Sequence, residues 1–271
     1  MRTRSPRARR TTLPLAGVAL GVLALVGYGA FRLVTRESSE PASVSAALAH
    51  FRALPPSAGA VPPHLRGHVP QPGVYVYATH GFEVSHVLGT RRHRYPTQTT
   101  ITVSTTRRGC LRTRWDVLAT RHDATLTCPR ARTAPRLIAQ SEEHEFAAHV
   151  DRRAYLCTPS SAAGPARLAA GARWHSRCAI DGTTTIDDGS VLGRRTLTLD
   201  GAHTRTVLLR TTTRVSGETT GAGTTFTWVL PRTRLIVRRT IANASTTQTV
   251  VGGVRYEERA TLALTTAQPR R

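Results

Sequence analysis

From Gly73 to Pro269 the chain alternates apolar with polar residues, and threonine, valine and arginine dominate this region. Alternation with a period of two is typical of strands that bury one face. No strong amphipathic helical pattern follows residue 60. The spacing of the segments indicates roughly ten to twelve strands. The pattern therefore predicts an all-β domain, mainly antiparallel, built as a curved sheet, a half-barrel or a sandwich, or closed into a barrel.

Chain reversals are expected where glycine, proline or aspartate cluster between the apolar runs. A first hairpin is expected around His80-Gly81. Later reversals are expected at Asp200-Gly201, between Gly217 and Gly223, and at Pro231-Arg232. These positions would divide the domain into short antiparallel hairpins.

The N-terminal part of the chain contains an uncharged, almost wholly apolar run, Leu13–Phe31. As a helix this run would be about 28 Å long, close to the hydrocarbon thickness of a bilayer. Arginines precede and follow it, and the positive-inside bias places the N-terminus in the cytoplasm. The sequence therefore predicts four regions: a basic cytoplasmic N-terminus (1–12), a transmembrane signal-anchor (13–34), a Pro/Ala-rich linker with a short helix (35–72) and a β-rich extracytoplasmic domain (73–269).

Two other interpretations of the apolar run are a cleaved signal peptide and a buried helix of a soluble domain. The residues at its end, Gly27-Tyr28-Gly29-Ala30, match a cleavage site poorly, and no cysteine is present there for lipidation. We therefore expect an uncleaved, single-pass protein of the cell membrane, with the lipid bilayer as a partner through residues 13–34. In the linker, Val44–Leu54 has helical spacing, and its Leu48 and Phe51 could dock on the domain.

All four cysteines, Cys110, Cys128, Cys157 and Cys178, lie on the side expected to be extracytoplasmic. Four cysteines in that environment indicate two disulfides rather than free thiols or a metal site, and none of the spacings is C-x-x-C. The sequence alone allows three connectivities.

The position of one turn narrows these connectivities. If the chain reverses at His122-Asp123, where local turn chemistry is strongest, Cys128 lies opposite Val117, roughly 23 Å along the strand from Cys110. A disulfide needs Cα atoms within about 7 Å of each other. A reversal near Ala119-Thr120 allows the bridge. We favour that turn and the pairs Cys110–Cys128 and Cys157–Cys178.

Basic residues far outnumber acidic ones: 38 Lys+Arg, all of them arginine, stand against 16 Asp+Glu, a net charge of +22. An excess of arginine over lysine is what a high-GC coding bias produces, yet the positive field still attracts anionic lipids or polymers. Guanidinium groups also pair with phosphate or carboxylate in bidentate fashion. Nucleic acid is not an expected partner, because the anchor places the domain on the wrong side and aromatic residues do not interleave with the basic ones.

Candidate catalytic motifs fail on spacing. HEFAAH, His144–His149, has its histidines five residues apart, whereas the H-E-x-x-H zinc motif needs them four apart on one helix face. Glu142, Glu143 and Glu145 are most simply solvated on a short charged strand, and Asp181–Gly189 lacks the ligand spacing of a calcium loop. The chain has no G-x-S-x-G, P-loop or dinucleotide fingerprint. We predict no catalytic residue, no cofactor site and no metal ligand, and we expect that the protein is not an enzyme.

Six segments of the domain carry a resemblance to a known family: GVYVYATHGFE, HRYPTQTTITV, GCLRTRWDVLATR, AYLC, TWVLPRTRLIVRR and GGVRYEERATLAL. Together they resemble a family of uncharacterised actinobacterial envelope proteins with one N-terminal transmembrane helix. The resemblance implies two sequential cysteine pairs, and it carries over no particular activity or catalytic residue. The family usually has a glycine where this chain has Ala119-Thr120. The strand pattern is also similar, more weakly, to the half-barrel of LolA-like lipoprotein carriers.

These observations favour a membrane-anchored extracytoplasmic protein that binds an amphipathic or anionic envelope component, such as a lipid or a polymer. The alternative is a structural or interaction module that binds another envelope protein through its sheet edge or its linker. An apolar-lined cavity would favour a lipid carrier, whereas a filled core would favour an interaction module.

Overall fold

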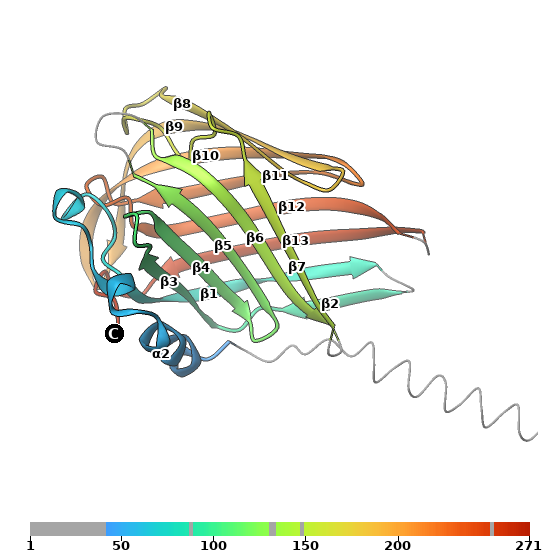
Figure 1. The fold of residues 1–271 in the computed structure, drawn as a ribbon, viewed down its shortest axis with the longest axis horizontal. Helices are drawn as coiled ribbons and strands as arrows, with labels where there is room; N and C mark the ends of the chain where they lie inside the picture. The colour runs from blue at the N-terminus through green and yellow to red at the C-terminus, as the bar shows by residue number, and fades with distance from the viewer. Residues whose placement is uncertain (1–41, 87–88, 130–133, 147–148, 250–251) are drawn as a thin grey trace, which may run out of the picture.

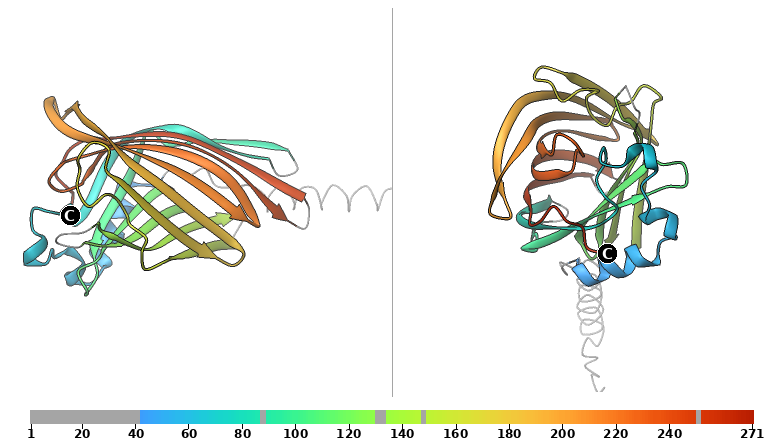
Figure 2. Two further views of the ribbon diagram at one scale, coloured as in Figure 1. Left: turned by 90° about the horizontal axis from the view of Figure 1, so that it is seen from above. Right: turned by 90° about the vertical axis from the view of Figure 1, so that its left-hand side faces the viewer.

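The computed structural model describes residues 42–86, 89–129, 134–146, 149–249 and 252–271. In these residues the chain forms one antiparallel sheet whose β1 and β13 also pair with each other, so that twelve strands, β1 and β3 to β13, close into a barrel (Figure 1, Figure 2). The expected all-β, mainly antiparallel architecture is confirmed. The sheet is a closed barrel rather than a half-barrel or a sandwich.

Nearly every strand pairs with the next one along the chain, which makes an up-and-down barrel. The strands are β1 Gly73–His86, β2 Thr90–Arg94, β3 Gln98–Thr105, β4 Leu111–Leu118, β5 Arg121–Cys128, β6 Arg136–Phe146, β7 His149–Cys157, β8 Arg173–Ile180, β9 Thr183–Leu199, β10 Ala202–Gly217, β11 Thr219–Val229, β12 Ile236–Thr249 and β13 Gly252–Leu264.

The strands run between two ends of the barrel, which we call the base and the rim. The base carries the connections at Thr106–Cys110, Asp200-Gly201 and Leu230–Leu235, and the C-terminal residues lie beside them in Figure 1. The rim carries the turns at Asp181-Gly182 and Gly217-Glu218. The expected reversals at Asp200-Gly201 and Pro231-Arg232 are therefore confirmed. The reversal expected between Gly217 and Gly223 is present, but it is confined to Gly217-Glu218, because β11 begins at Thr219.

Strands β2 and β3 are two parts of one strand that pairs with β1. The Tyr95 amide donates to the Gly81 carbonyl at 3.0 Å, and the Thr79 amide donates to the Thr97 carbonyl at 2.8 Å, so the register with β1 continues across the gap. Pro96 interrupts the ladder because proline has no backbone N–H to donate. The interruption leaves Tyr95 buried inside the barrel.

The weakest seam of the wall lies between β7 and β8, which share two residue pairs, Leu156↔Ala179 and Cys157↔Cys178. The second pair is the disulfide. The loop of residues 158–172 covers part of β8, where the Ala162 amide donates to the His175 carbonyl at 2.9 Å. The wall is therefore held at this point by one covalent bond and a short ladder.

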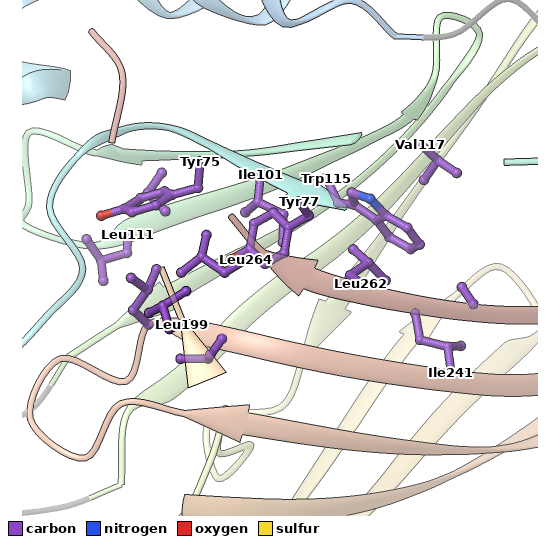
Figure 3. Close-up of a cluster of buried hydrophobic side chains, with 14 of the residues drawn as sticks. Tyr75, Tyr77, Ile101, Leu111, Trp115, Val117, Leu199, Ile241, Leu262 and Leu264 are labelled. Atoms are coloured by element: carbon purple, nitrogen blue, oxygen red, sulfur yellow. The ribbon is translucent and has the colours of Figure 1, made fainter. Parts of the chain in front are cut away.

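Apolar side chains fill the interior near the base. Tyr77 of β1, Trp115 of β4 and Leu262 of β13 point toward one another there (Figure 3). The Trp115 indole N–H donates to the Thr99 hydroxyl at 3.1 Å, so the buried ring is satisfied. Other buried members are Tyr75, Ile101, Val103, Leu111, Val117, Leu199, Leu235, Val237, Ile241 and Leu264. Burial of each such side chain contributes about 1.5–3 kcal/mol.

The linker helix is present and docks on the outside of the barrel. Helix α2, Val44–Ala53, begins at Ser43, whose hydroxyl accepts a hydrogen bond from the Ala46 amide at 3.0 Å. It lies against β1 and β3, with Ala47 buried and Leu48 and Phe51 half-buried, as expected. Two short 3-10 helices, η1 Pro56–Gly59 and η2 Pro63–Leu65, lead from α2 toward β1.

The hairpin expected around His80-Gly81 is wrong, because β1 runs straight through these residues. Gly81 lies where β1 and β13 approach each other closely, and it is not part of a turn. A Cβ atom at Gly81 would lie 2.4 Å from the Arg259 carbonyl oxygen and 2.8 Å from the Ala260 Cα. Glycine is therefore needed here so that β13 can close the barrel against β1.

Both disulfides join the pairs that we favoured, Cys110–Cys128 and Cys157–Cys178. In the β4–β5 hairpin Leu118 pairs with Arg121, so the chain reverses at Ala119-Thr120 and not at His122-Asp123. The registry of the whole hairpin, rather than local turn chemistry, decides the position of this turn.

The described part of the chain contains no helix that is long and apolar enough to cross a bilayer. The predicted cytoplasmic segment 1–12 and membrane segment 13–34 lie outside the described residues, so they stay predictions.

Candidate functional site

Strand register identifies which side chains face the inside of the barrel. Tyr77 pairs with Leu264, and both belong to the filled core. Because side chains alternate along a strand, Glu83 of β1 and Glu258 of β13, which pair with each other six residues further on, also face inward. The two buried glutamates mark a charged layer that follows the apolar core on the way to the rim.

Arg121, the first residue of β5, reaches across this layer to β1 and β13. Its Nη1 donates to the hydroxyls of Tyr95 and Tyr256, at 2.6 Å each, and to the Glu83 carboxylate. Its Nη2 donates to Glu258 at 3.3 Å. The guanidinium group therefore joins opposite parts of the wall.

The two tyrosines connect the arginine to the glutamates. The Tyr95 hydroxyl donates to Glu258 Oε1 at 2.6 Å, and the Tyr256 hydroxyl donates to Glu83 Oε2 at 3.0 Å. The Asn243 amide donates to the other Glu258 oxygen at 3.3 Å. Each carboxylate thus accepts bonds from a hydroxyl as well as from a cation, which offsets part of the cost of burying its charge.

Electrostatics hold this layer charged. The Arg121, Glu83 and Glu258 side chains are only 8%, 9% and 4% exposed. Burial alone would lower the pKa of Arg121, but the Glu258 carboxylate and its neighbours hold that pKa well above its ordinary value. Burial raises the pKa of Tyr95, so its hydroxyl keeps its proton and stays a donor. The layer is a fixed array of donors and acceptors.

Asp123 and Glu142 extend the layer along β5 and β6. They pair across the two strands, and Glu142 in turn pairs with Arg153 of β7. Desolvation raises the pKa of Asp123 against the opposing effect of Arg121. Enclosure by the wall, together with the Asp123 charge, raises the pKa of Glu142 to about 7. Glu142 is nevertheless exposed, which means that water inside the barrel reaches it.

A second polar group lies on β6, β8, β9 and β10 around Asp187. The Thr213 hydroxyl donates to Asp187 Oδ1 at 2.6 Å, and the Ser176 hydroxyl donates to Oδ2 at 3.2 Å. The Gln140 amide of β6 donates to the same Oδ2 at 3.4 Å, bridging two strands that are not neighbours. Asp187 therefore lies on the inner side of the wall.

Toward the rim, the inner face of β9 to β11 is largely polar and half-buried, while Val191, Val207 and Val229 of the same strands are buried nearer the base. Thr211, Thr213, Thr225 and Thr227 share the face of Asp187 by register, and each remains partly exposed. Residues of the apolar core on the same barrel are almost wholly buried. Side chains therefore fill the interior near the base, while the part nearer the rim remains open to water.

Several polar atoms of the charged layer are buried without a partner. Among the described residues these include Asp123 Oδ1, Arg121 Nε and Arg239 Nε, all on inward-facing side chains. Buried polar atoms without partners are costly and uncommon. The three atoms are one acceptor and two donors whose hydrogen bonds the described side chains do not satisfy.

The described side chains of this layer carry more negative than positive charge. Inward-facing carboxyl groups belong to Glu83, Asp123, Glu142, Asp187 and Glu258, and inward-facing guanidinium groups belong to Arg121, Arg153 and Arg239. Among the described inward-facing side chains, carboxyl groups therefore outnumber guanidinium groups by five to three, in contrast to the protein as a whole, whose net charge is +22.

The residues that the sequence analysis singled out do not lie together in the structure. The disulfides lie away from the charged layer, at the β4–β5 and β7–β8 seams. His144 falls in β6 and His149 begins β7, and their side chains lie outside the described part. No cluster of three or more metal-binding side chains occurs in the described part of the chain. Glu142 and Glu143, both expected to be solvated, face opposite sides, because Glu142 points inward and Glu143 pairs outward with Arg152.

Sequence reasoning missed the residues of the charged layer. One signal for them was present: the segments that carry the family resemblance contain Glu83 in GVYVYATHGFE, Tyr95 in HRYPTQTTITV, Arg121 in GCLRTRWDVLATR, and Tyr256 and Glu258 in GGVRYEERATLAL. Four separate segments thus each contribute a residue to one cluster.

No protein-family model matches the chain, and no curated protein matches it in sequence. A solved structure with some similarity is that of the hypothetical lipoprotein YmcC from Escherichia coli (K12), with a TM-score of 0.34 and 9% sequence identity, over 82% of this chain and 97% of that chain. A similarity this low identifies neither a family nor a function. The resemblance to actinobacterial envelope proteins stays a prediction.

Proposed function

We propose that the protein is a membrane-anchored extracytoplasmic binding protein whose barrel interior binds a hydrophilic ligand that carries a positive charge. The observation that carries the proposal is the group of inward-facing carboxyl groups beside Arg121, of which Asp123 is 26% exposed and Glu142 is exposed. The predicted signal-anchor and the two disulfides support the location outside the cytoplasm.

The ligand is hydrophilic because the accessible part of the inner wall is polar. Toward the rim, threonine hydroxyls and carboxyl groups line it, with Trp174 and Leu209 as half-buried apolar neighbours, whereas the apolar core near the base is filled by the protein's own side chains. A lipid tail would leave these polar groups without hydrogen bonds, which is unfavourable. We therefore replace the expected amphipathic ligand by a hydroxyl-rich or amine-bearing one.

The ligand is cationic because the interior has surplus carboxylates. The raised pKa values of Asp123 and Glu142 reflect enclosure among other negative groups, which a bound cation would relieve. The partly exposed carboxyl group of Asp123 and the exposed carboxyl group of Glu142 supply acceptors for an ammonium or guanidinium group. An anionic ligand would face more carboxyl groups than guanidinium groups among the described inward-facing side chains.

A matched series of sugars tests this proposal on the full chain in detergent micelles. The probes are glucosamine, which is cationic, N-acetylglucosamine, which is neutral, and glucuronate, which is anionic. Thermal unfolding and titration calorimetry should show binding that falls in this order. Equal binding of all three, or preference for glucuronate, would contradict the proposed charge selectivity.

Two adjacent glutamates provide a matched pair of variants. Glu142→Gln removes an inward charge and should weaken glucosamine binding several-fold, while Glu143→Gln removes an outward charge and should leave glucosamine binding unchanged.

The alternative function, an interaction module, has one observation in its favour: β2 pairs with no strand other than β1 in the described sheet. However, β2 reads TRRHR, and charged residues on an edge strand discourage strand addition.

A further inference from the structure

The arginines of the base gather where almost no acidic residue lies. Exposed or half-buried arginines in the base connections and the flanking segments are Arg66, Arg107, Arg108, Arg167, Arg232, Arg234, Arg270 and Arg271. Among the described residues, the base connections carry one carboxylate, Asp200. The other described acids lie farther along the strands, inside the barrel or toward the rim. The excess of positive charge is thus concentrated at one end of the molecule.

Contacts between loops place these arginines on one surface. A Cβ atom at Gly67 would lie 3.3 Å from the Arg232 guanidinium group, so η2 and the β11–β12 connection are adjacent. Arg234 donates from Nη1 to the Pro165 carbonyl at 2.8 Å, which adds the loop that carries Arg167. The Arg270 and Val74 backbones exchange two hydrogen bonds, at 2.8 and 2.9 Å, which adds the C-terminal residues.

The turn that carries Arg107 and Arg108 belongs to the same surface. A Cβ atom at Gly109 would lie 3.2 Å from Pro62, in the segment between η1 and η2. Arg107 and Arg108 are both exposed. None of the base arginines named above forms an ion pair with a carboxylate in the described part of the chain. Their charges therefore face solvent uncompensated.

We propose that this basic base docks on the anionic lipid surface of the membrane that holds the predicted anchor. Guanidinium groups pair with phosphate oxygens in bidentate fashion, and a cluster of several arginines near a charged bilayer binds it through its summed field. Docking in this orientation turns the rim, and with it the accessible interior, away from the membrane.

The tether is short enough to favour the membrane over a soluble polymer as the partner. Residues 35–43 separate the predicted membrane segment from α2, and nine residues span at most about 30 Å when fully extended. Helix α2 itself ends at the base, because Arg52 in its last turn donates to the Arg271 carbonyl at 2.9 Å. The base therefore stays within reach of the bilayer. This step rests on the predicted anchor and not on binding in the interior.

Hydrogen exchange of the full chain in nanodiscs tests the proposal. Two kinds of disc are compared, phosphatidylcholine alone and phosphatidylcholine mixed with phosphatidylglycerol. We expect amides of Thr106–Cys110 and Leu230–Leu235 to exchange several-fold more slowly in the anionic discs, with the rim turn Gly217-Glu218 unchanged. High salt should remove the difference, because salt screens exposed charges. Equal exchange in both discs would overturn the proposal.

Two sets of variants that remove the same number of arginines test whether the protection depends on the arginines of the base or on the total charge of the protein. Arg107→Gln, Arg108→Gln and Arg232→Gln together should abolish the protection, while Arg177→Gln, Arg210→Gln and Arg259→Gln, on exposed positions in the middle of strands, should preserve it. Loss of protection in both triple variants would contradict a defined binding surface.

Protection of the same turns by soluble polyphosphate in neutral discs, but not by phosphatidylglycerol, would show that the partner of the base is a polymer and not the membrane. A chain that leaves both kinds of disc would remove the tether and overturn the proposal, while sugar binding in micelles would still report on the interior.

Discussion

Arg121 of β5 and Tyr256 of β13 meet inside the barrel, with Nη1 donating to the hydroxyl at 2.6 Å. They come from strands that are not neighbours in the sheet, so this contact joins two sides of the wall. Around it lie the buried carboxylates of Glu83 and Glu258. A buried network of this kind is rigid while each of its polar groups keeps its partner.

Removal of the Arg121 charge should therefore destabilise the protein strongly. Arg121→Gln leaves Glu83 and Glu258 buried without their cation, and breaking a buried pair in this way costs about 3–5 kcal/mol. Urea unfolding of the variant measures the loss. Arg210→Gln is the control, since Arg210 is exposed, and its effect should stay within about 0.5 kcal/mol. Arg121→Met combined with Glu83→Gln should recover part of the stability, and no recovery would argue against a charge-balance role.

The two disulfides should differ in their local effects. They close loops of similar length, with sequence separations of 18 and 21, so each contributes about 3 kcal/mol in the chain-entropy model. Seven residue pairs join β4 to β5, but two join β7 to β8. Replacement of Cys157 and Cys178 by serine should therefore open the β7–β8 seam to hydrogen exchange, whereas serine at Cys110 and Cys128 should leave the β4–β5 ladder protected. Equal protection of both seams would show that the short ladder suffices.

Local patterns predicted the elements of the fold but not its closure. Alternation marks the strands, and the reach of a disulfide fixes the β4–β5 turn against the local preference for His122-Asp123. Closure depends on pairs such as Tyr77↔Leu264, which lie at opposite ends of the domain and leave no periodic signal. The same pairing of β1 with β13 explains why the predicted hairpin at His80-Gly81 is wrong. A glycine that is needed for close approach of two strands cannot be distinguished locally from a glycine in a turn.

The candidate site could not be predicted from strand alternation because its inner wall is polar. Where one face of a strand is apolar, alternation tells the inside from the outside, but along Gln140–Glu143 both faces are polar. Arg121 and Glu258 are 137 residues apart in the chain, so their contact also leaves no local pattern. Only the register of the closed barrel brings them together.

Stability should depend on pH through Glu142. Enclosure and the Asp123 charge raise its pKa from 4.5 to about 7 in the folded state. The folded protein then binds more protons than the unfolded chain between about pH 4.5 and about pH 7, so this group lowers stability as the pH rises through that window. Glu142→Gln should remove the loss, and its melting temperature relative to the parent protein should rise across the window.

Glu143 supplies the control for this titration. A hydrogen bond from Arg152 lowers the pKa of Glu143, so its contribution to stability is present at neutral pH and is lost as the pH falls through its folded-state value. Glu143→Gln should therefore leave the pH dependence near neutrality unchanged. If both variants changed the pH dependence of stability between about pH 4.5 and about pH 7, the inward placement of Glu142 would be contradicted.

Closure of the barrel should be sensitive to a single methyl group at Gly81. In Gly81→Ala the new Cβ would lie 2.4 Å from the Arg259 carbonyl oxygen, so β1 and β13 must separate locally, and such overpacking costs about 1–3 kcal/mol. Gly253→Ala is the matched control, because the nearest atom to its Cβ is a Thr246 methyl at 3.4 Å, an ordinary contact. Hydrogen exchange should show faster exchange along β1 and β13 in the first variant alone. Since Glu83 and Glu258 pair across this same seam, the first variant should also weaken glucosamine binding, and unchanged binding with a loosened seam would separate the ligand site from barrel closure.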